Sequence, residues 1–182
     1  MSPESITHQG LASLKPIEAS GFTVPETDLE SLDRQAAKAR LAALPFVDYQ
    51  RLERPSERRS PIVEIEDVAF PVSRIIATER GFGDWAGAGT DKNTYSGEKK
   101  ASLDAALDYL ELEFDPKKHT PLHLRLFTDD DGEIWGQVVD GTHRIMAAKL
   151  RGDEAVTVDL TVPEDPDELP RYRGSVLEDF SD

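Results

Sequence analysis

The sequence contains no cysteine and no long apolar run. Without thiols, the chain cannot form disulfides, thiolate zinc sites or a cysteine nucleophile. No apolar stretch approaches the roughly 20 residues that a membrane-spanning helix needs, and residues 1–5 lack the basic start of a secretory signal. We therefore expect a cytoplasmic protein that does not associate with a membrane.

Basic residues are also scarce. The chain has 21 Lys and Arg against 36 Asp and Glu, so its formal net charge is −15. Duplex DNA and anionic membranes are bound mainly through Lys and Arg, so this charge makes nucleic acid an unfavourable partner. The length of 182 residues and the hydrophobic content of 38% fit one globular core.

The hydrophobic pattern divides the chain into three regions. Residues 1–60 combine a loosely held arm with an amphipathic helix, which begins at the capping box Thr27–Glu30 and ends at Pro45. Residues 61–162 form the main domain, with a glycine-rich insertion at 78–100 that suits a surface loop or lid. Residues 163–182 are acidic and contain three prolines, which predicts a flexible acidic tail.

The main domain alternates strand and helix signals. Apolar and polar residues alternate in the expected strands, and the expected helices have apolar residues at helical spacing. We predict strands over 62–68, 121–127, 133–139 and 155–162, a further apolar stretch over 72–77, and helices over 101–112 and 142–150. This order predicts an α+β fold, in which both helices pack on a small mixed sheet and the N-terminal helix is an extension.

A short basic run precedes the main domain. It contains Arg51, Arg54, Arg58 and Arg59 and is interrupted by Pro55. We interpret it as a solvated linker, and a strip that contacts phosphate is the alternative.

The chemistry of the chain is concentrated where a strand leads through glycine into a helix, at Asp140-Gly141-Thr142-His143-Arg144. The N–H groups of a first helical turn attract anions, and glycine lets a phosphate approach the backbone. Arg144 can grip phosphate oxygens with two parallel hydrogen bonds. The alternative is structural, with Asp140 as a helix cap and the following side chains solvated.

The run 121–160 contains this turn, a hairpin before it, and Ala147-Ala148, Gly152 and a strand after it. This run resembles the core of the ParB/sulfiredoxin-like superfamily, whose members bind nucleotide phosphates at such a turn. Sulfiredoxin chemistry is excluded, because it needs a cysteine where Thr142 stands. A partition-type ParB protein carries a DNA-binding domain after the nucleotide domain, whereas 30 residues follow Gly152 here, so we do not expect a partition role. The motif is most similar to the D-G-H-H-R turn of free serine kinases, with Thr142 in place of the first histidine.

The resemblance implies that ATP or another nucleoside triphosphate binds with Mg²⁺, and that its phosphates lie at Gly141, Thr142, His143 and Arg144. Asp140 would hold Mg²⁺ or take a proton, and His143 would donate to phosphate. In the serine kinases an acidic residue between the early strand and helix acts as the base, and Glu64, Glu66 and Glu79 are the candidates here. The implied activity is that of a phosphotransferase acting on a small-molecule acceptor, or of a nucleotide hydrolase.

Two other functions remain open at this stage. The first is a ParB-like nuclease or DNA-associated protein, which would need a continuous basic surface. The second is a non-enzymatic nucleotide-sensing or partner-binding module, which would dock a protein through the N-terminal helix or the acidic tail.

Overall fold

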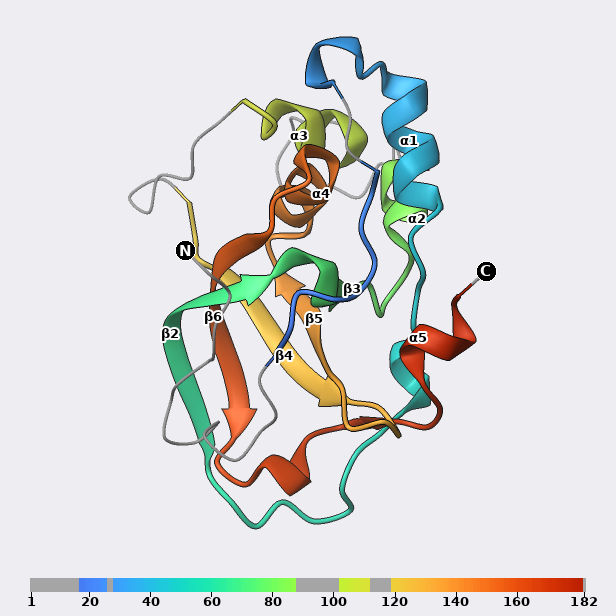
Figure 1. Ribbon diagram of the computed structural model, residues 1–182. Helices are drawn as coiled ribbons and strands as arrows, with labels where there is room; N and C mark the ends of the chain where they lie inside the picture. Colours follow the sequence, from blue (N-terminus) through green and yellow to red (C-terminus); the bar gives the residue numbers. More distant parts are fainter. Residues whose placement is uncertain (1–16, 26–27, 88–101, 112–118, 182) are drawn as a thin grey trace.

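The computed structural model describes residues 17–25, 28–87, 102–111 and 119–181. A mixed sheet forms the centre of these residues, with helices α3 and α4 beyond one end of it and α1 and α2 beside them (Figure 1). The strands are β1 (Leu52–Glu53), β2 (Ile62–Pro71), β3 (Ile75–Ile76), β4 (Leu122–Thr128), β5 (Ile134–Asp140), β6 (Ala155–Pro163) and β7 (Arg171–Tyr172). The α-helices are α1 (Arg34–Ala42), α2 (Phe82–Gly87), α3 (Ser102–Asp108), α4 (Thr142–Arg151) and α5 (Val176–Asp179). The α+β class is confirmed.

Strand β4 lies at the middle of the sheet. It pairs antiparallel with β5 across the predicted hairpin and parallel with β6 on its other side. Strand β6 in turn pairs antiparallel with β2, and β5 pairs parallel with β3. Because β3 and β5 are parallel, their carboxyl ends lie at the same edge of the sheet. The segments that follow these two strands therefore meet at this edge.

Helix α4 is bounded by two left-handed glycines, Gly141 with a φ of +94° and Gly152 with a φ of +74°. Its apolar residues are buried, and it contacts α3 and α1. The end at Gly152 matches the sequence prediction, because a left-handed glycine is the usual way to terminate a helix. No helix in the described ranges is long and apolar enough to cross a bilayer.

The glycine-rich insertion begins with a helix, α2, where we expected a loop. Gly83 explains part of this difference: a Cβ there would lie 2.5 Å from the Cα of Ala42 in α1. This glycine therefore permits close packing of two helices. Residues 88–100 of the insertion lie outside the described residues. The N-terminal helix also begins later than predicted, with Asp33 as its N-cap.

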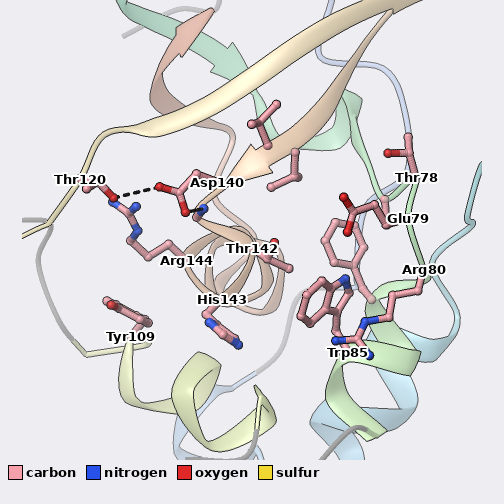
Figure 2. A pocket seen from close by; sticks show the side chains of 15 residues that line it. Thr78, Glu79, Arg80, Trp85, Tyr109, Thr120, Asp140, Thr142, His143 and Arg144 are labelled. Atoms are coloured by element: carbon pink, nitrogen blue, oxygen red, sulfur yellow. Dashed lines mark hydrogen bonds between the residues drawn. The ribbon is translucent and has the colours of Figure 1, made fainter. Parts of the chain in front are cut away.

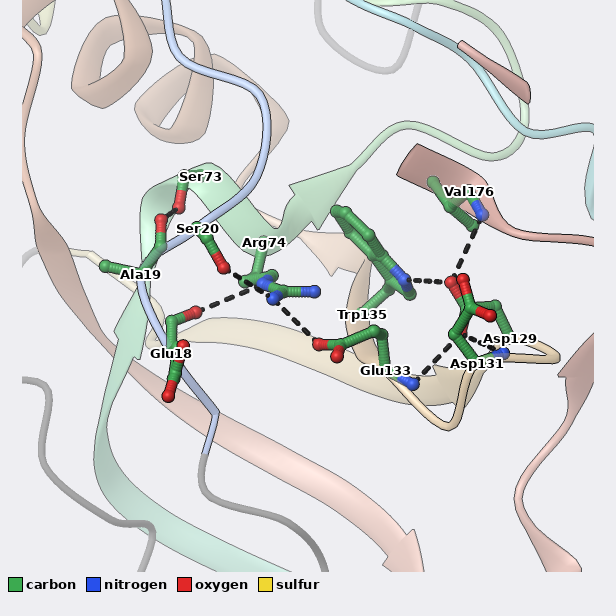
Figure 3. Close-up of polar contacts among 10 residues, drawn as sticks. All are labelled: Glu18, Ala19, Ser20, Ser73, Arg74, Asp129, Asp131, Glu133, Trp135 and Val176. Carbon is green, nitrogen blue, oxygen red and sulfur yellow. Dashed lines mark hydrogen bonds and ion pairs between the residues drawn. The ribbon is translucent and has the colours of Figure 1, made fainter. Parts of the chain in front are cut away.

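The C-terminal segment is not the flexible tail that we expected. Strand β7 pairs with β1 and with β4, and Leu169, Tyr172 and Val176 are buried. Asp129, in the hairpin turn, accepts hydrogen bonds from the Trp135 Nε1 (3.1 Å) and from the Val176 backbone N (3.1 Å), as Figure 3 shows. Apolar anchors and one buried carboxylate thus hold an otherwise acidic segment against the sheet.

The buried Arg74 fixes part of the N-terminal arm. Its guanidinium bonds to the Glu18 carbonyl (3.1 Å) and the Ser20 hydroxyl (2.9 Å), and it forms an ion pair with Glu133 (2.8 Å) (Figure 3). It also lies 4.6 Å above the Trp135 ring. The arm and the main domain therefore share one packed unit in this region.

Candidate functional site

A pocket of about 410 Å³ opens where β5 ends and α4 begins (Figure 2). One wall is the D-G-T-H-R turn, and the other is the connection from β3 to α2. The lining residues are Ala77, Thr78, Glu79, Arg80, Phe82, Trp85, Tyr109, Thr120, Val138, Val139, Asp140, Gly141, Thr142, His143 and Arg144. The predicted phosphate-binding turn therefore lies in a pocket large enough for a small organic ligand.

Two features of the turn require a glycine at position 141. Its left-handed φ of +94° is strained for any residue with a side chain, and a Cβ there would lie 2.2 Å from Leu122 Cδ2. The same Cβ would be 3.2 Å from Arg144 Nη2, so the guanidinium lies close over this backbone.

The N-terminus of α4 carries no side-chain cap, whereas Asp33 caps α1 and Ser175 caps α5. The N–H groups of a first helical turn have no acceptor within the helix. In α4 these groups belong to residues that line the pocket. The helix thus presents uncapped donors and the positive end of its dipole to the pocket.

Asp140 does not cap α4, contrary to the structural alternative. Its Oδ1 accepts a hydrogen bond from the Gly141 backbone N (2.8 Å), and its Oδ2 accepts one from the Thr120 hydroxyl (3.0 Å). Figure 2 shows the Arg144 side chain extending toward Thr120 and Asp140. Burial lowers the pKa of Arg144, and Tyr109 and Asp140 oppose that effect. Because an arginine guanidinium is not deprotonated in proteins, Arg144 carries a positive charge in the pocket.

The pocket wall includes polar atoms that are buried and have no hydrogen-bond partner within the described part of the chain. Among them are the Thr78 Oγ1 and the His143 Nε2. His143 lies edge-on to Trp85, with 6.3 Å between the ring centroids. Burial and the charge of Arg80 lower the pKa of His143, so the imidazole is neutral at pH 7. Both atoms suit a ligand with polar groups, because unsatisfied buried polar atoms are costly.

Of the three predicted base candidates, the structure brings only Glu79 into the pocket. Its side chain lies on the wall opposite Asp140 (Figure 2). Glu64 and Glu66 are exposed on β2, which is separated from β5 by β6 and β4, and neither lines the pocket. The expectation that they belong to the same site is therefore corrected.

The sequence prediction missed several pocket residues: Thr78, Arg80, Trp85, Tyr109 and Thr120. The Arg80 guanidinium lies 3.6 Å above the Trp85 ring and gives the pocket a second cation. A signal for part of this set exists in the sequence, because Thr78, Glu79 and Arg80 directly follow a buried apolar strand. Polar residues at the carboxyl ends of parallel strands often line ligand sites.

The predicted magnesium ligand is Asp140. Among the residues that the structure describes, no group of three or more His, Asp or Glu side chains is placed to hold a metal ion. A carboxylate oxygen that accepts one hydrogen bond keeps a second lone pair. Asp140 therefore fits Mg²⁺ as one ligand among phosphate oxygens and waters, which is the usual way this ion binds beside nucleotides.

Comparisons with protein-family models, curated proteins and solved structures found no match to this chain. The resemblance to the ParB/sulfiredoxin-like superfamily therefore remains a prediction that rests on residues 121–160.

Proposed function

We propose that the protein binds a nucleoside triphosphate with its phosphates at the N-terminus of α4, and that it acts as a phosphotransferase or a nucleotide hydrolase of the ParB/sulfiredoxin-like type. The proposal rests on one main observation. The uncapped first turn of α4 opens into a pocket whose walls include the Thr78 Oγ1 and the His143 Nε2, buried polar atoms without partners among the described residues.

The turn has the donors that a polyphosphate needs. Residues 142–144 line the pocket, their backbone N–H groups have no acceptor within the helix, and an anion at such a terminus gains roughly 0.3–2 kcal/mol from the helix dipole. A hydrogen bond to the charged guanidinium of Arg144 adds about 1.5–3 kcal/mol. The neutral His143 can donate from Nε2 in one of its two tautomers. Arg80, on the opposite wall, supplies positive charge toward the end of the chain of phosphates.

The chemical step uses the two walls together. The acceptor hydroxyl, or water in a hydrolase, loses its proton to Glu79 as its oxygen bonds to the γ-phosphorus. The bond from phosphorus to the β,γ-bridging oxygen breaks, and the electron pair leaves with the nucleoside diphosphate. Mg²⁺ held by Asp140 and phosphate oxygens neutralises negative charge when it is bound. Arg144 and the α4 amides hold the phosphates in line for transfer.

The experiment is a screen of ATP, ADP and CTP with Mg²⁺ by calorimetry and thermal shift. We expect one triphosphate to bind and raise the melting temperature, and Arg144→Ala to weaken that binding at least about tenfold. Arg171→Ala is the matched control, because it removes the same charge from an exposed ion pair with Asp130 outside the pocket.

The outcomes separate the three functions. Binding together with release of diphosphate supports an enzyme. Tight binding without turnover favours the nucleotide-sensing module instead. If no nucleotide binds to the native protein but oligonucleotides do, the nuclease or DNA-associated function replaces the proposal.

A further inference from the structure

A second pocket, of about 400 Å³, lies away from the α4 turn and shares no lining residue with it. We name it the arginine pocket. It is bounded by residues of five strands, β1, β2, β4, β5 and β6, by the segment between β1 and β2, and by the chain after β6. Its lining residues are Leu52, Arg54, Pro55, Arg58, Ile62, Arg125, Leu126, Gln137, Thr161, Pro163, Glu168 and Pro170.

Three polar side chains form a row across the sheet at this pocket. Arg125 on β4 lies directly opposite Gln137 on β5 and directly opposite Thr161 on β6. Residues opposite one another on paired strands point to the same face. A guanidinium, an amide and a hydroxyl therefore stand side by side, and His123 Nε2 bonds to the Thr161 hydroxyl and fixes its position.

Gln137 is the central observation. It is only 7% exposed, yet its side-chain amide makes no hydrogen bond to any residue that the structure describes. A carboxamide has two N–H donors and an acceptor oxygen, and those of Gln137 are not among the buried unpartnered atoms of the described residues, so they are accessible from the pocket. A ligand in the pocket would satisfy them.

The charge of the pocket is opposite to that of the protein. The chain has a net charge of −15, but three arginines and one glutamate line this pocket. None of Arg54, Arg58 and Arg125 forms an ion pair within the described ranges, and the Arg54 guanidinium is positioned 4.7 Å above the Tyr49 ring. The Glu168 carboxylate is occupied by the Ser60 hydroxyl (2.8 Å) and the Arg59 backbone N (2.7 Å).

We propose that the arginine pocket binds a small organic molecule with a doubly charged oxyanion group, either a phosphate monoester or a pair of carboxylates. Guanidinium groups bind both kinds of group with paired hydrogen bonds. The Gln137 amide donates to an anion oxygen. The apolar part of the ligand lies against Leu52 and the 40% exposed Ile62. The basic run before the main domain, which we interpreted as a linker, thus lies against the sheet and contributes Arg54 and Arg58 to a binding site.

The test is calorimetry at low ionic strength with three probes: phenyl phosphate, phthalate and inorganic phosphate. The measurements are made in Arg144→Ala protein, so that anion binding at the α4 pocket is weakened, and the variants below assign the binding that remains. We expect phenyl phosphate or phthalate to bind more tightly than inorganic phosphate, because only these two have an apolar part. The stronger of the two identifies the anionic group.

Two variants locate the binding. Arg125→Gln weakens it at least about tenfold, since it removes a charge-assisted hydrogen bond. Gln137→Leu also weakens it, because the amide that would donate to the ligand is lost, and leaves the melting temperature nearly unchanged, because this amide makes no hydrogen bond to a described residue. Arg34→Gln, which removes one charge from an exposed ion pair with Asp104, serves as the matched control and keeps full affinity.

Three results would overturn the proposal: no binding of any probe, equal affinity in Arg125→Gln and the parent, or an equal loss in Arg34→Gln. None of these results bears on nucleotide binding, which the Arg144→Ala comparison tests separately. The two proposals can therefore fail independently.

Discussion

Substitution of Gly141 tests the turn at which the proposed phosphate site is built. Gly141→Ala introduces a Cβ at a φ of +94°, 2.2 Å from Leu122 Cδ2 and 3.2 Å from Arg144 Nη2. A left-handed conformation costs a residue with a side chain about 1–2 kcal/mol. Forcing Leu122, which is in the core, to move costs about 1–3 kcal/mol more. We expect Gly141→Ala to lower the free energy of unfolding by about 3 kcal/mol.

Gly152→Ala is the matched control at the other end of α4. This glycine has a φ of +74°, but a Cβ there meets no atom within 4 Å. Gly152→Ala should therefore lower the free energy of unfolding only by the cost of the left-handed backbone conformation, about 1 kcal/mol. Urea denaturation of the native protein, Gly141→Ala and Gly152→Ala gives the loss of stability in each variant, provided that the three m-values agree.

A double-mutant cycle identifies the contact. In a Leu122→Ala background the alanine at 141 has room, so Gly141→Ala should cost at least about 1 kcal/mol less than it does alone. Equal losses for Gly141→Ala and Gly152→Ala, with no coupling to Leu122, would refute the geometry of the turn.

Three further predictions concern buried charge and catalysis. Burial lowers the pKa of Lys149 to about 7, so the unfolded chain binds the proton more tightly and the burial costs stability most at and below neutral pH. Lys149→Met should therefore raise the free energy of unfolding at pH 7 by about 2 kcal/mol, reduced by the free energy of the lost hydrogen bond to the Val72 carbonyl. This gain in stability should shrink as the pH rises toward 10. A gain that grows with pH would contradict the predicted sign. Asp129→Ala should cost about 3–5 kcal/mol in urea denaturation and speed hydrogen exchange at the Val176 amide, since four donors lose their acceptor, and a loss below about 1 kcal/mol would count against it. Glu79→Gln should reduce turnover of the nucleotide at least about 100-fold and leave its affinity nearly unchanged, and unaltered turnover would remove Glu79 as the base.

Local sequence signals were sufficient for the elements around the turn. The hairpin was predicted from alternating strands around an Asp- and Gly-rich turn, and β4 and β5 lie within one residue of the predicted bounds. Helix α4 was predicted over 142–150, between Gly141 and Gly152, because both glycines have a conformational role that sequence reveals directly, and it ends one residue later, at Arg151. These are short-range effects, which residue type and spacing alone can specify.

The remaining features depend on contacts between distant parts of the chain. The C-terminal segment looks disordered by composition, but Asp129 binds the backbone of Val176, 47 residues further on. Glu64 and Glu79 were equivalent by sequence, and only the order of the strands separates them. Arg125, Gln137 and Thr161 come from three strands, and the row that they form requires the pairing register. Side-chain periodicity gives no information about any of these three arrangements.

Two-dimensional NMR of the backbone amides tests the central claim most directly. The claim is that the phosphates of a nucleotide lie against the first turn of α4. During titration with ATP and Mg²⁺, or with whichever triphosphate binds, we predict the largest shifts at the amides of Thr142, His143 and Arg144, because an anion there accepts their hydrogen bonds. Saturation with nucleotide that leaves these three amides unmoved, while others shift, would contradict the account.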